Sequence, residues 1–169
     1  MKLHIGGEKI KDGWSILNIQ SKPGIDFLGD ISDLSQFSDS SLDEIYASHT
    51  LEHVSQNKMQ DTLFGIFRVL KPNGKFYVSV PDLDILCHSF TSPIYSIDIK
   101  FQLMRMMYGG QEDSFDFHYF GWNQELLYKY LGIAGFKNAE RVDSFNLFDD
   151  FSDYKPFGFP ISLNVIATK

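Results

Sequence analysis

The sequence has very little cysteine and no apolar run long enough to cross a bilayer as a helix. Cys87 is the only cysteine among 169 residues, so no disulfide can form within the chain. A lone thiol is typical of a reducing compartment, and the first residues show neither the charged region nor the cleavage site of an export signal. We therefore expect a cytoplasmic protein with no membrane span.

The chain also lacks an excess of positive charge. Its 15 Lys and Arg against 22 Asp and Glu give a net charge of −7. Proteins that bind duplex nucleic acid gain much of their affinity from basic patches on phosphates, so we predict no nucleic-acid partner. A small-molecule substrate fits this composition better, and nothing in it indicates an oligomeric state.

The signature of nicotinamide-binding enzymes is missing as well. The first apolar run, residues 2–7, ends in Gly6 and Gly7, but Glu8 follows where G-x-G-x-x-G would continue. No acid follows the second run, residues 15–20, which ends in Gln20. Glycines at a strand end can serve a tight turn or let a ligand approach the backbone, and the residues alone leave both interpretations open.

Short β-rich runs alternate with helical patterns through most of the chain, which predicts one domain over residues 1–169. The predicted strands are residues 2–7, 15–20, 25–30, 44–48, 75–82, 137–144 and 160–169. The predicted helices are residues 56–70, 83–90, 94–110 and 123–136, the last with Asn123 as N-cap and its end near Gly135. This α/β pattern predicts a Rossmann-like, three-layer, doubly wound sheet.

Five segments in this order resemble the class I S-adenosylmethionine-dependent methyltransferases. They are LHIGGEKIKDGW, DEIYASHTLEHV, FRVLKPNGKFYVSVPDLD, YGGQEDSFDFHYFGW and LGIAGFKNAERV. The resemblance is greatest to small predicted methyltransferases of the methyltransferase type 11 kind, which are often linked to polysaccharide biosynthesis. It implies strand order 3-2-1-4-5-7-6 with an antiparallel seventh strand, and S-adenosylmethionine as the cofactor.

The resemblance also implies positions for cofactor contacts. Gly6 and Gly7 would pass close to the methionine part, and Asn18 stands where the family usually has an acid that binds both ribose hydroxyls. Asp30 and Ile31 match the place where adenine is held. Two alternatives remain open here. The neighbouring Gln20 could contact the ribose or be a polar strand end in water, and Asp30 could hold adenine or stand in a solvated turn.

Two further cofactor contacts are implied where the fourth strand opens. Ser48 and His49 would face the transferred methyl group. Glu8 departs from the usual glycine, and it would either meet the ammonium group of the cofactor or repel its carboxylate. Because Glu8 and Asn18 depart together, the alternative to an enzyme is a catalytically degenerate, methyltransferase-like partner module.

His49 and His118 are the candidate catalytic residues, because a histidine there could contact the acceptor or take its proton. His118 could instead simply pack within its aromatic loop. Asp82, after the fifth strand, could act as a base or cap the helix that begins at Leu83. Methyl transfer mainly needs alignment of the acceptor with the methyl group, so a dedicated base is optional.

The motif H-x-x-E-H, formed by His49, Glu52 and His53, has the residue types of a zinc site. It follows a strand, and no distant third ligand is evident from the sequence. We therefore predict no metal and expect a structural hydrogen bond for His53. The predicted function is methyl transfer from S-adenosylmethionine to a small molecule or a saccharide intermediate.

Overall fold

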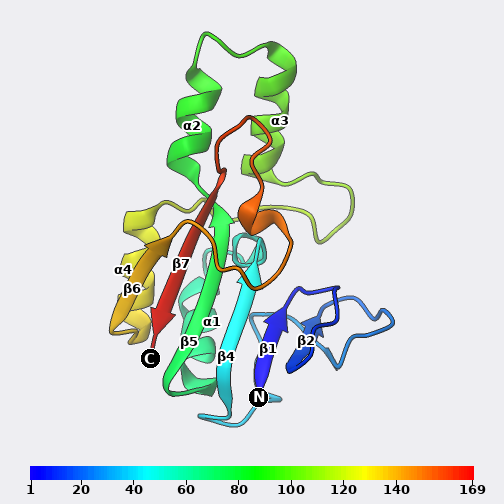
Figure 1. The fold of residues 1–169 in the computed structure, drawn as a ribbon, viewed down its shortest axis with the longest axis vertical. Helices are drawn as coiled ribbons and strands as arrows, with labels where there is room; N and C mark the ends of the chain where they lie inside the picture. Colours follow the sequence, from blue (N-terminus) through cyan, green and yellow to red (C-terminus); the bar gives the residue numbers. More distant parts are fainter.

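The computed structural model describes residues 1–169 and contains one mixed sheet of seven strands in the order β3-β2-β1-β4-β5-β7-β6 (Figure 1). The strands are β1 (Lys2–Ile5), β2 (Trp14–Asn18), β3 (Phe27–Leu28), β4 (Leu42–Ser48), β5 (Leu70–Pro81), β6 (Asn138–Val142) and β7 (Ser162–Thr168). Strands β1 to β5 pair in parallel, and β7 runs antiparallel to both β5 and β6. The predicted fold class and strand order are therefore confirmed.

The register of the parallel strands brings several predicted site residues to one edge of the sheet. Ile5 of β1 lies opposite Leu17 of β2 and Ala47 of β4. The next residues along each strand therefore meet at the carboxyl ends, where ligands bind in open α/β sheets.

Two helices, α1 (Met59–Val69) and α4 (Gln124–Ala134), cover one face of the sheet (Figure 1). The apolar residues of α1 recur at spacings of three and four, so they form one stripe that packs in a cluster of 27 buried residues. The Asn123 side chain caps α4 by accepting from the backbone N–H of Leu126, and Gly135 ends the helix in a left-handed conformation. Both α4 boundaries agree with the sequence prediction.

The opposite face is covered by the connection between β6 and β7, which we call the β6–β7 segment (Asp143–Ile161). It contains one short 3-10 turn, η2 (Phe151–Asp153), and crosses the sheet in front of β4 and β5 (Figure 1). Phe148 from this segment packs against the rings of Trp14 and Tyr46, with centroids 5.3 and 4.6 Å apart. The sheet thus has a layer on each face, but only one layer is helical, because the connections before β2 and β3 are too short to contain helices.

Helices α2 (Leu83–Thr91) and α3 (Ile97–Tyr108) form a hairpin that projects beyond the carboxyl ends of the strands (Figure 1). Asp82 caps α2 by accepting from the N–H of Asp84 at 3.2 Å, and it also pairs with Arg141 at 2.8 Å. Asp82 was expected to act either as a base or as a helix cap, and in the structure it caps α2. None of the helices combines the length and the apolar character that a bilayer crossing requires.

Candidate functional site

Two cavities adjoin at the carboxyl ends of β1, β2 and β4. The larger has a volume of about 1070 Å³ and the smaller about 410 Å³. Gly6, Glu8, His49 and His53 line both of them. The two volumes are in the range of small-molecule sites, so the geometry allows two ligands to meet at the shared wall.

The predicted cofactor residues are distributed over these two cavities. The smaller cavity is lined by Gly6, Glu8, Asn18, Asp30, Ile31 and His49. Gly7 and Ser48 line the larger cavity. The sequence prediction therefore selected residues that the fold brings together, although they come from four separate stretches of the chain.

The two glycines after β1 are required for different reasons: Gly6 by its backbone conformation and Gly7 by the nearby ring of His4. Gly6 has φ +76°, and a Cβ there would lie 2.6 Å from Thr50 Oγ1. A Cβ on Gly7 would lie 2.5 Å from Nδ1 of His4. The tight-turn interpretation therefore holds for Gly6, and both glycines line the cavities without a side chain.

Asn18 is largely buried and ties the end of β2 to this turn. Its Nδ2 donates to the Gly7 carbonyl at 3.1 Å, and its Oδ1 accepts from the backbone N–H of Gln20 at 2.9 Å. Each end of the amide can form one further hydrogen bond. The Gln20 side chain donates to Asp113 at 3.4 Å, so a carboxylate from the loop after α3 also lines the smaller cavity.

Asp30 and Glu8 each already have a partner. Oδ1 of Asp30 accepts from the N–H of Ser32 at 2.7 Å, which forms the turn that was the structural alternative for this residue, while its other oxygen has no partner in the protein. Glu8 pairs with Lys22, whose ammonium also lines the smaller cavity. The charge of Glu8 is therefore partly compensated before any ligand binds.

The end of β4 places Ser48 and His49 beneath the larger cavity. Ser48 Oγ donates to Asp150 of the β6–β7 segment at 3.2 Å. His49 has φ +49°, which is unusual for a residue with a Cβ, and its Nε2 lies 2.8 Å from Ser162 Oγ. Ser162 Oγ donates to the Phe151 carbonyl at 3.0 Å, so it accepts its bond from a hydrogen on His49 Nε2.

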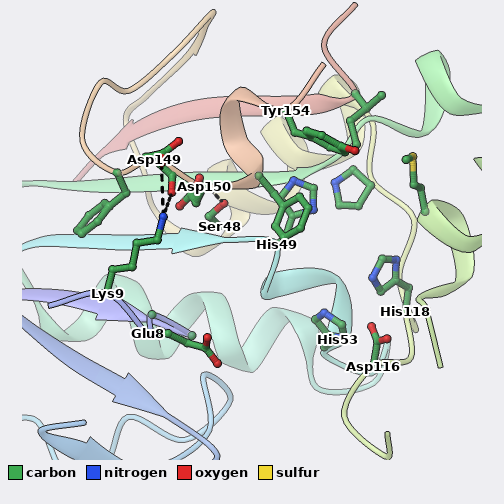
Figure 2. Close-up of a pocket in the computed structure, with 18 of the residues that line it drawn as sticks. Glu8, Lys9, Ser48, His49, His53, Asp116, His118, Asp149, Asp150 and Tyr154 are labelled. Carbon is green, nitrogen blue, oxygen red and sulfur yellow. Dashed lines mark hydrogen bonds and ion pairs between the residues drawn. The ribbon is translucent and has the colours of Figure 1, made fainter. Parts of the chain in front are cut away.

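Glu52 lies in the short turn η1 (Leu51–His53), 1% exposed and surrounded by three histidines. Its Oε1 is 3.4 Å from His49 Nδ1 and 4.0 Å from His118 Nε2. Figure 2 shows His49, His53 and His118 around one space, from the end of β4, from η1 and from the loop after α3. Both candidate catalytic histidines are therefore brought to the same buried carboxylate.

Charge and burial act in opposite directions on the pKa values of this group. Burial raises the pKa of Glu52, but the electrostatic effect of the nearby His49, His53 and His118 side chains outweighs it, so the pKa lies below its usual value. Burial lowers the pKa of His118 more than the Glu52 charge raises it. His53 Nδ1 lies 3.1 Å from the Phe117 carbonyl, which confirms the structural hydrogen bond predicted for this residue.

Sequence reasoning missed most of the larger cavity. Helix α3 contributes Gln102 and Arg105, and the β6–β7 segment contributes Asp149, Phe151 and Tyr154. These residues follow no motif, and the adjacent acids at positions 149 and 150 inside an aromatic stretch were the one available signal. The wall of this cavity combines polar side chains with apolar surface, to which Met106, Phe148 and Ile161 contribute.

Comparisons with known proteins agree with this architecture. Residues 14–78 match the model of a methyltransferase domain family. No curated protein sequence gives a significant match to the chain. Many solved structures share its fold.

Two of these structures illustrate the likeness. A SAM-dependent methyltransferase from Archaeoglobus fulgidus superimposes with a TM-score of 0.63 at 16% identity, over 99% of this chain and 85% of that one. The 1,6-didemethyltoxoflavin-N1-methyltransferase of Burkholderia thailandensis, solved with 1,6-didemethyltoxoflavin and S-adenosylhomocysteine, gives 0.62 at 16% identity, over 99% and 70%. The chain therefore has the fold of S-adenosylmethionine-dependent methyltransferases, and with the domain match this fold supports an enzyme whose cofactor is S-adenosylmethionine.

Proposed function

We propose that residues 1–169 act as one domain that binds S-adenosylmethionine in the smaller cavity and methylates a small polar acceptor in the larger one. The observation that carries this proposal is the shared wall of the two cavities at Gly6, Glu8, His49 and His53. A cofactor and an acceptor that meet at this wall would have their reacting atoms side by side.

The smaller cavity offers suitable partners for each part of the cofactor. Asn18 keeps one free donor and one free acceptor for the ribose hydroxyls, and the nearby Asp113 supplies the carboxylate that Asn18 lacks. Asp30 keeps one oxygen for the adenine amino group beside the apolar side chain of Ile31. Glu8, held by Lys22, is placed for the ammonium group of the methionine part.

The wall of the larger cavity favours an acceptor that carries hydroxyl groups. Asp116, Asp149 and Asp150 supply acceptors for such groups, and Gln102 and Arg105 supply donors. We therefore propose a saccharide intermediate as the acceptor.

We also propose a cytoplasmic location, because the lone cysteine of the chain is typical of a reducing compartment.

The bound cofactor supplies a methyl group activated by its sulfonium charge. The chain itself has to hold the acceptor in line with that methyl group and keep bulk water away. His49 lines both cavities and is held by Ser162, while His118 lines the larger cavity. These two residues are therefore placed to position the acceptor at the reacting atoms.

Calorimetric titration with S-adenosylhomocysteine tests cofactor binding without knowledge of the acceptor. The variant Asp30→Asn keeps an oxygen for the Ser32 turn but presents an NH₂ group to the adenine amino group, so we expect about tenfold weaker binding, roughly 1.4 kcal/mol. Asp33→Asn is the matched control, because Asp33 forms the same kind of turn with Ser35 and lines neither cavity. No heat and no thermal shift at millimolar S-adenosylmethionine would instead identify a degenerate partner module.

A further inference from the structure

We infer that Glu52, His53 and His118, with His49 beside them, form a binding site for a divalent transition-metal cation. One ligand atom from each of Glu52, His53 and His118 lies within 4.8 Å of the other two. The sequence alone argued against a metal because no third ligand was evident. The fold supplies that ligand, because it brings His118 beside Glu52 and His53.

The strongest sign of a missing cation is the Glu52 carboxylate. Both of its oxygens are buried, and neither has a hydrogen-bond partner in the protein. A buried carboxylate is costly unless hydrogen bonds or a nearby positive charge compensate it. The nearest ring nitrogen, on His49, lies 3.4 Å from Glu52 Oε1, and that of His118 lies 4.0 Å from the same oxygen, so nitrogen donors rather than N–H groups surround this carboxylate.

The hydrogen bonds of two histidines leave lone pairs free for a metal. A backbone carbonyl can only accept, so His53 Nδ1 carries the hydrogen that it shares with Phe117, and Nε2 is free. His49 donates from Nε2 to Ser162, which leaves the Nδ1 lone pair facing Glu52. Metal-binding histidines typically donate their second ring N–H to a backbone or side-chain oxygen in this way.

The donor set indicates the class of metal. Imidazole nitrogens with one carboxylate are the usual ligands of catalytic Zn²⁺ and of non-haem Fe²⁺, whereas Mg²⁺ and Ca²⁺ prefer oxygen ligands. The four side chains of this cluster provide three imidazoles and one carboxylate. We therefore assign the site to a cation of the Zn²⁺, Fe²⁺ or Co²⁺ class.

The place of the cluster suggests what the cation does, and this part rests on the proposed methyltransferase function. His49 and His53 line both cavities and His118 lines the larger one, so a cation here would keep an open position toward the acceptor. A hydroxyl oxygen held there loses its proton more easily. The oxygen lone pair then forms the bond to the methyl carbon, the carbon–sulfur bond breaks with its electrons left on sulfur, and the proton passes to water in the larger cavity.

Metal binding can be measured on the full chain without cofactor or acceptor. After treatment with a chelator, titration with Co²⁺ followed by visible absorption, and with Zn²⁺ by calorimetry, should give one equivalent per chain. His53→Ala and His118→Ala should each weaken Zn²⁺ binding at least tenfold. His88→Ala, at an exposed histidine on α2, is the matched control and should bind like the unaltered chain.

The outcomes separate the two proposals. Circular dichroism of each variant establishes that it is folded, and Glu52→Gln, which removes the charge but keeps the shape, provides a third measurement of the same site. The inference would be overturned if the unaltered chain bound neither metal. It would also be overturned if the folded His53→Ala and His118→Ala variants bound Zn²⁺ as tightly as the unaltered chain. If S-adenosylhomocysteine still binds in that case, the proposed methyltransferase function stands without the metal.

A second measurement addresses the open position. Catechol, a probe with two adjacent hydroxyls, should shift the visible bands of the Co²⁺-loaded protein because it enters the coordination shell from the larger cavity. If the visible bands did not change at millimolar catechol, the proposal that the cation binds the acceptor hydroxyl would be overturned.

Discussion

The two faces of the sheet differ in what covers them, although the same strands form both. On the face under α1 and α4, Ile45 and Ala47 of β4 belong to the apolar core. Tyr46 and Ser48 of the same strand point to the other face and donate hydrogen bonds to Asp150 of the β6–β7 segment. One face is closed by apolar packing under helices, and the other by aromatic contacts and hydrogen bonds to an irregular segment.

This difference assigns stability and function to different faces. Burial of one large apolar side chain contributes about 1.5–3 kcal/mol, and each hydrogen bond to a carboxylate such as Asp150 contributes about as much. The helices, however, cover a core of 27 buried residues, whereas only a few such hydrogen bonds hold the β6–β7 segment. The helical face should therefore provide most of the free energy of folding. The face under the β6–β7 segment has the polar groups that a ligand site needs, and Ser48 and Asp150 both line the larger cavity.

Shortening a side chain on the helical face should have the largest effect. Ile66 is fully buried on α1, so Ile66→Ala should lower the free energy of unfolding by about 2–5 kcal/mol in urea titrations. Phe64→Ala, on the exposed side of the same helix, is the control and should change it by less than about 1 kcal/mol. A loss below about 1 kcal/mol for Ile66→Ala would contradict the division between the two faces.

The face under the β6–β7 segment should instead be sensitive to acid through His4. Burial lowers the pKa of His4 from 6.5 to about 4, against a smaller opposing effect of Asp150. Above pH about 6.5 the ring is neutral in both states, and as the pH falls toward 4 only the unfolded chain gains the proton. Stability should therefore fall over this window by up to about 3 kcal/mol and should lose no more from His4 below it.

Urea titrations between pH 4 and 7 measure this contribution. His4→Gln removes the titrating ring, so the variant should lose less stability than the unaltered chain as the pH falls. His88→Gln, at an exposed histidine, should leave the profile unchanged. Parallel profiles for the His4→Gln variant and the unaltered chain would show that burial of His4 does not cause the acid sensitivity.

Removing one hydrogen bond to the β6–β7 segment should have the smallest effect on stability. Tyr46 donates to the Asp150 carboxylate at 2.8 Å, and Asp150 keeps its bonds from Ser48 and Ser152 in the variant, so Tyr46→Phe should cost about 1.5 kcal/mol. Tyr77→Phe is the matched control, because the neighbouring Tyr77 contacts the segment through an edge-to-face packing of its ring on Phe145 rather than through its hydroxyl. If both variants lose equal stability in urea titrations, the hydrogen bond is not what holds the segment.

Periodic and local signals made the helical face predictable. Leu63 and Ile66 recur at helical spacing, and Asn123 and Gly135 act on residues of their own helix. The β6–β7 segment has no period, and its main contacts join Phe148 to His4 and Asp150 to Tyr46, far apart in the sequence. Local patterns contain no information about such contacts.

The residues of the candidate site also differ in how far the sequence could predict their positions. The turn at Gly6 and the strand ends at Asn18 and His49 follow from the order of strands, so their meeting could be expected. The approach of His118 to Glu52 depends on how the loop after α3 folds back, which no local pattern specifies. The resemblance to a family selected residues that line the smaller cavity, whereas most of the larger cavity and the histidine cluster required the three-dimensional structure.

The double role of the β6–β7 segment has a consequence for the way such an enzyme would acquire a new substrate. Phe148 and Asp150 secure the segment to the sheet and also line the larger cavity. Directed evolution at these positions would change substrate range and thermal tolerance together, so useful variants there should need compensating substitutions. Gln102 and Arg105 line the same cavity from the projecting α3, away from the sheet, and are the better starting points for a library.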